Sequence, residues 1–81
     1  MSDTINTLAA KLAEDTMKVM DETGNERFFV EVGEVLGAAS QSLEEAFLTE
    51  IRVRLAERKA RQFVVKRLSE HRSKLKAIEK Q

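Results

Sequence analysis

Few side chains in this sequence are of the types that catalyse reactions or bind metals. It contains one histidine, His71, and no cysteine, which excludes disulfides, thiolate metal sites and cysteine nucleophiles. A serine nucleophile would be Ser40 or Ser42 with His71 as its base, but both serines are better explained as helix caps. Glu31 and Glu34 lie one helical turn apart, yet no Glu-x-x-His sequence accompanies them to complete a carboxylate metal site. We therefore predict a protein that is not an enzyme and that binds no metal, cofactor or small-molecule substrate.

The charges that a partner would recognise are divided between the two ends of the chain. Residues 1–50 hold 11 acidic and 3 basic side chains, and residues 51–81 hold 11 basic and 3 acidic ones, so their net charges are −8 and +8. This division is typical of a basic segment that binds nucleic acid, or of acidic and basic surfaces that pair head to tail. A solvated helix whose charges pair along its own length is a third interpretation, and it leaves most of the cations free.

The basic side chains surround their segment and do not gather on one face. If they contact nucleic acid, this arrangement favours weak, salt-sensitive contact with phosphates over the reading of bases. The alternative is contact with an acidic protein surface. The candidate contact residues are Arg52, Arg54, Arg58, Lys59, Arg61, Lys66, Arg67, Arg72, Lys74 and Lys76.

A long helix is expected to carry this basic segment, from about residue 43 to residue 80. The segment 42–81 contains no Pro or Gly and is rich in strong helix formers. Ser42 and Glu45 have the spacing of a capping box at its start. At ~1.5 Å per residue the helix would be ~57 Å long, about twice the ~26 Å diameter of a globule of this size. It must therefore protrude or pair with a partner.

Two apolar faces follow each other along the long helix. The first, which includes Phe47 and Ile51, is expected to pack on the chain's own core. The second is turned from it by ~130° and has the 4-3-4-3 spacing of a coiled coil over two heptads. Residues 57–62 between them hold no large apolar side chain, so a kink or break there is the alternative. We predict that the second face is an oligomer interface, which consists of Val64, Leu68, His71, Leu75 and Ile78.

Two shorter helices are expected before the long one, at about residues 4–22 and 25–39. Gly24 between them suits the left-handed conformation that follows a helix end, and Thr23 is spaced to start a capping box for the second helix. The apolar stripe of the first helix leaves Met17 at its edge; its members are Ile5, Leu8, Ala9, Leu12, Thr16, Val19 and Met20. The apolar face of the second helix consists of Phe28, Phe29, Val32, Val35, Leu36 and Ala39.

Residues 32–47 resemble the helix-turn-helix of bacterial regulators. Gly33 takes the place of the small residue four positions before the turn glycine, Gly37, and apolar residues follow at the expected places. The resemblance implies that the helix after the turn binds DNA. That helix begins with Glu44 and Glu45, which repel phosphates, so the sequence departs from the motif where bases would be read.

Together these features predict an all-α fold in one domain (residues 1–81), with a two-helix N-terminal hairpin and one long C-terminal helix. They favour a non-enzymatic adaptor that forms homo-oligomers. This architecture resembles that of small helical subunits of phage-type DNA-packaging or secretion assemblies, an analogy of fold alone. The alternative is a small protein that binds nucleic acid through its basic helix. Because no secretory signal and no membrane-spanning run is visible, we expect a cytoplasmic protein without a membrane partner.

Overall fold

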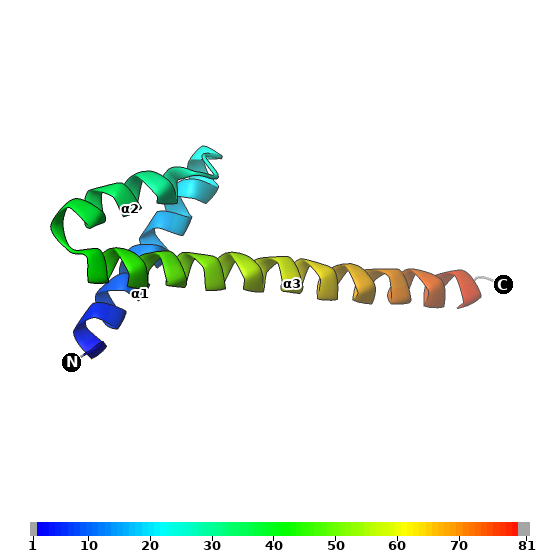
Figure 1. The fold of residues 1–81 in the computed structure, drawn as a ribbon. Helices are drawn as coiled ribbons and strands as arrows, with labels where there is room; N and C mark the ends of the chain where they lie inside the picture. The colour runs from blue at the N-terminus through cyan, green and yellow to red at the C-terminus, as the bar shows by residue number, and fades with distance from the viewer. Residues whose placement is uncertain (1, 80–81) are drawn as a thin grey trace.

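The computed structural model describes residues 2–79, which form three helices and no strand. Helix α1 spans Ser2–Thr23, α2 spans Phe28–Ala39 and α3 spans Gln41–Glu79 (Figure 1). The predicted all-α architecture is confirmed. The alternative of a break at residues 57–62 is wrong, because α3 is one uninterrupted helix of 39 residues. Lys80, the last residue assigned to this helix from the sequence, lies outside the described residues.

Helices α1 and α2 pack on the first half of α3 and leave its second half projecting (Figure 1). The molecule therefore measures 64 × 29 × 13 Å, and α3 sets its longest dimension. We call α1, α2 and residues 41–60 the head, and residues 61–79 of α3 the arm. None of the described helices is long and apolar enough to span a membrane.

The core of the head lies where α1 crosses α3 (Figure 1). Phe47 and Ile51 of α3 have 0% of their surface exposed, and so have Ala9 and Ala13 of α1. The small alanine side chains let the two helices approach closely, so that the larger side chains of α3 fill the space between them. Helix α2 covers the other side of this cluster with half-buried apolar residues, which are Phe28, Phe29, Val32 and Leu36.

The buried face of α1 is rotated around the helix axis relative to the apolar stripe that the sequence predicted. Met17, predicted at the edge of the stripe, is buried, whereas Leu8, a member of the stripe, is 55% exposed. Val19 is exposed as well. The crossing point explains the difference, because α1 turns Ala9, Ala13, Met17 and Met20 toward the core and leaves Leu8 and Val19 outside it.

Of the two predictions made for the turn between α1 and α2, only the left-handed conformation of Gly24 is confirmed. Gly24 has φ +74°, and its N–H donates a hydrogen bond of 2.9 Å to the carbonyl of Met20. The capping box predicted from Thr23 does not form. The hydroxyl of Thr23 instead donates to the carbonyl of Val19 at 2.7 Å, and α2 begins only at Phe28.

One residue, Ser40, both ends α2 and caps α3. Its backbone is extended, and its N–H donates to the carbonyl of Leu36 at 2.7 Å. Its hydroxyl oxygen accepts a hydrogen bond of 3.2 Å from the N–H of Leu43, a free donor in the first turn of α3. The cap predicted at Ser42 is therefore wrong by two residues.

Helices α2 and α3 form an antiparallel pair and not a helix-turn-helix. Gly37 lies inside α2, so its predicted role as the turn glycine is wrong. A Cβ atom at Gly37 would lie 2.9 Å from a carboxylate oxygen of Glu44, and one at Gly33 would lie 3.4 Å from Leu48. Both pairs are nearly symmetric about Ser40, so α2 runs back along α3 (Figure 1). A helix-turn-helix needs a turn of about three residues and helices at roughly 90–120°.

Candidate interaction surface on the arm

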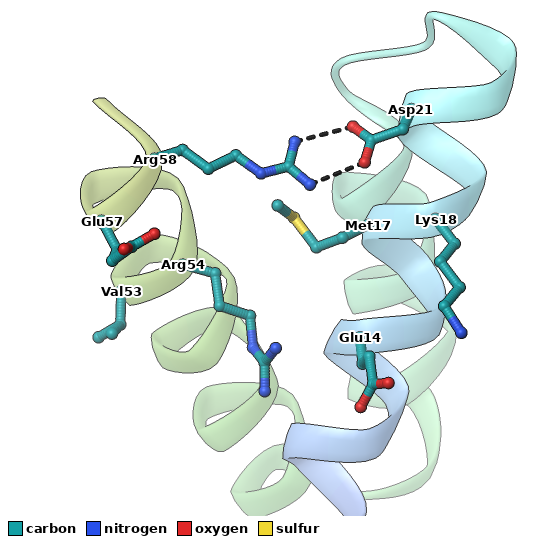
Figure 2. Close-up of a pocket in the computed structure, with 8 residues that line it drawn as sticks. All are labelled: Glu14, Met17, Lys18, Asp21, Val53, Arg54, Glu57 and Arg58. Carbon is teal, nitrogen blue, oxygen red and sulfur yellow. Dashed lines mark hydrogen bonds and ion pairs between the residues drawn. The ribbon is translucent and has the colours of Figure 1, made fainter. Parts of the chain in front are cut away.

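A groove of about 400 Å³ runs between α1 and α3 at the edge of the head (Figure 2). It is lined by Glu14, Met17, Lys18 and Asp21 of α1 and by Val53, Arg54, Glu57 and Arg58 of α3. The guanidinium of Arg58 closes one end of the groove with two hydrogen bonds, of 2.8 and 2.7 Å, to the carboxylate of Asp21. Among the described residues no group of three or more acidic, histidine or cysteine side chains is placed to hold a metal ion.

Arg54 and Arg58 hold α3 against α1. Arg54 donates to the carbonyl of Ala10 at 3.4 Å and forms an ion pair of 3.3 Å with Glu50. The hydrogen bonds from Arg58 lower the pKa of the Asp21 carboxyl, against the smaller opposing effect of desolvation. Both arginines were candidates for contact with a partner, and the structure engages both within the head.

The five predicted interface residues lie together on one exposed face of the arm, and nothing in the described part of the chain packs on them. We call these residues, Val64, Leu68, His71, Leu75 and Ile78, the arm seam. Val64 is 61% exposed and Ile78 67% exposed, and the three residues between them are exposed as well. A contiguous apolar face of this kind is typical of an interaction site.

The same face continues into the head, which the sequence analysis missed. Ala60 and Val53 precede Val64 by four and eleven residues, so all three lie within ~40° of one another around the helix. Both residues are exposed. The eleven-residue spacing from Val53 to Val64 could have indicated this continuation, but the heptad positions before Val64 fall on Arg61, Glu57 and Arg54, which are all charged. Glu57 forms an ion pair with Arg61, one helical turn further along α3.

Cations border the arm seam on both sides. Arg67 and Lys74 lie ~60–80° from its centre on one side, and Arg72 lies ~80° from it on the other. The guanidinium of Arg67 is 5.2 Å from the ring centre of Phe63, a cation–π contact that covers part of this exposed ring. The remaining candidate cations, Arg52, Lys59, Lys66 and Lys76, are exposed elsewhere around α3. The seam is therefore an apolar strip in a positive field.

Comparison with protein-family models, with curated proteins and with solved structures finds no match to this chain. A function must therefore be inferred from the surfaces of the chain itself. The arm seam and its cations form an exposed surface that the fold of the head does not use.

Proposed function

We propose that this chain is a non-enzymatic adaptor that assembles with further copies of itself through its arm. The observation that carries the proposal is the exposed arm seam, which has coiled-coil spacing and has no cover within the described part of the chain. Such small helical proteins commonly gain stability by association, because one short core buries little apolar surface.

The apolar residues of the seam set the expected strength of association. Val64, Leu68, Leu75 and Ile78 are each about half exposed, so covering them gains on the order of 4 kcal/mol from this helix alone. A partner helix adds a similar amount, and the loss of translational and rotational freedom on association cancels a large part of the sum. We therefore expect assembly at micromolar concentrations and not an obligate complex.

A second candidate function is weak binding of nucleic acid. It is supported by the exposed cations around the arm, including Lys66 and Lys76, which lie away from the seam. Such binding would be blind to sequence and would weaken by ~0.9 log units per log unit of salt for each phosphate contact. DNA retardation measured at several salt concentrations tests this function independently of self-association.

The adaptor function is tested by the solution mass of the wild-type chain and of a variant with a charged seam. We expect the wild type to be a dimer or larger at micromolar concentration, and Leu68→Asp with Leu75→Asp to be a folded monomer. Ser69→Asp with Ser73→Asp is the matched control, because it adds the same two charges to the arm ~140° or more away from the seam centre. Monomeric wild type, or equal loss of assembly in the control, would contradict the proposal.

A further inference from the structure

Two arms that paired seam to seam would bring like charges together. In a parallel pair of the observed heptad spacing, Arg67 of one arm faces Arg72 of the other, because these residues occupy the two flanking positions of the heptad, and only position 74 meets an opposite charge, at position 79. In an antiparallel pair each edge faces the same edge of the partner, so Arg67 and Lys74 meet a second copy of themselves. Like charges at such flanking positions oppose association. The seam therefore fits a partner of opposite charge better than it fits another arm.

The head presents a surface with that opposite charge on α2. Glu31, Glu34, Val35 and Ala38 follow one another at helical spacing and form one exposed face, which we call the α2 outer face. Val35 is 73% exposed, although its place in the apolar stripe of α2 predicted burial. The α2 outer face thus combines a free aliphatic side chain and a small alanine with two carboxylates.

Within one molecule the arm seam cannot reach the α2 outer face. Helix α3 is uninterrupted from Gln41 to Glu79 and contains no Gly or Pro, so it holds the arm straight and away from its own head (Figure 1). The two surfaces can meet only when they belong to different molecules. The α2 outer face from Glu31 to Ala38 is ~10 Å long, so it can cover about half of the ~21 Å seam from Val64 to Ile78.

We propose that the arm seam of one copy docks on the α2 outer face of a second copy, head to tail. This inference rests on the proposed adaptor function and specifies its contact. Each molecule carries both surfaces, so the contact either closes reciprocally in a two-fold dimer, with each arm on the other head, or continues into a chain or a ring. Because the interface is a single pair of helices flanked by opposite charges, assembly is weak and decreases as salt increases.

The test uses two variants of the full chain, each of which removes one surface. Leu68→Asp with Leu75→Asp removes the arm seam, and Glu34→Lys with Val35→Lys removes the α2 outer face. All four side chains are exposed, so both variants keep the fold, which circular dichroism checks. Sedimentation velocity at micromolar concentration then gives the size of each protein alone and of their equimolar mixture.

We expect the wild type to be a dimer or larger at micromolar concentration and each variant alone to remain a monomer. The mixture should form dimers and nothing larger, because one intact arm and one intact head remain to form a single contact. If the α2 variant assembles as the wild type does, the contact is seam to seam: the inference fails while the adaptor function stands. A mixture that stays monomeric overturns the α2 outer face as the receiving surface.

A wild type that remains monomeric would remove the proposed self-assembly and this inference together. If that monomer retards DNA in a steeply salt-dependent manner, the occupant of the arm is a phosphate backbone.

Discussion

Both halves of α3 are rich in helix-forming residues and both carry apolar side chains, but these side chains have different surroundings in the two halves. In the head, Phe47 and Ile51 are fully buried against α1. In the arm, Val64 and Leu68 occur at the same spacing of four residues and are exposed. Both halves are helical because their residues favour helices and include no Gly or Pro. They differ only in that α1 and α2 pack on the first half. The apolar residues of the head are thus committed to stability, while those of the arm remain available for binding.

The cations of α3 divide in the same way. In the head, Arg58 and Arg54 bind groups of α1, so their charges help to hold two helices together. In the arm, Arg72, Lys74 and Lys76 have no other helix within the described part of the chain to bind. This contrast assigns folding to the head and recognition to the arm, and substitutions can test how sharp the division is.

The largest expected effect is the loss of core packing in the head. Phe47→Ala should lower the free energy of unfolding by about 3–5 kcal/mol, because it leaves a cavity between α1 and α3. Leu68→Ala, an aliphatic truncation in the arm, should change it by less than about 0.5 kcal/mol. Urea denaturation of dilute protein, below the concentration at which it assembles, measures both. A large cost for Leu68→Ala under these conditions would show that the arm is covered within one molecule.

A smaller effect, with opposite signs, is expected at the two glycines that the sequence marked as turns. Gly24 has a positive φ, so Gly24→Ala should destabilise the head by about 1 kcal/mol. Gly37 is helical and exposed, and the only close group is the flexible carboxylate of Glu44, so Gly37→Ala should stabilise by about 0.5 kcal/mol. Thermal denaturation of both variants measures these changes in stability. If both lose stability equally, Gly37 is the turn that the helix-turn-helix resemblance implied.

The sequence predicted those parts of the fold that depend on local preferences. Continuous helix formers predict α3, the first apolar face predicts burial of Phe47 and Ile51, and Gly24 predicts the left-handed turn. The spacing of the arm seam residues also predicts that they lie on one face of α3. This face is exposed because the two shorter helices can cover only half of α3. These features need no knowledge of how the helices cross.

The features that the sequence did not predict depend on tertiary packing. The burial of Met17 and the exposure of Leu8 follow from the crossing of α1 and α3, and the exposure of Val35 follows from the face that α2 turns toward the core. Periodicity along one helix cannot indicate either arrangement. The cap at Ser40 depends on the tight link between α2 and α3. For the same reason the sequence placed Arg58 among the binding residues, since only the approach of α1 brings Asp21 to it.

The smallest expected effect concerns this ion pair, which marks the boundary between head and arm. The hydrogen bonds from Arg58 lower the pKa of Asp21 below its ordinary value of 3.8, so the pair stabilises the folded state when the carboxyl is ionised. This contribution is complete above that value and is lost as the pH falls through the lowered pKa. Both side chains are about half exposed, so solvent and salt screen the pair and the effect is slight.

Asp21→Asn should therefore unfold at a slightly lower urea concentration than the wild type at neutral pH and low salt, and the difference should vanish in strong acid. Asp15→Asn is the matched control, because Asp15 is exposed and pairs only within α1, with Lys11 at 3.5 Å. If both variants behave alike, or if the difference persists in acid, the pair does not fasten α1 to α3, and the boundary of the head lies closer to Ile51.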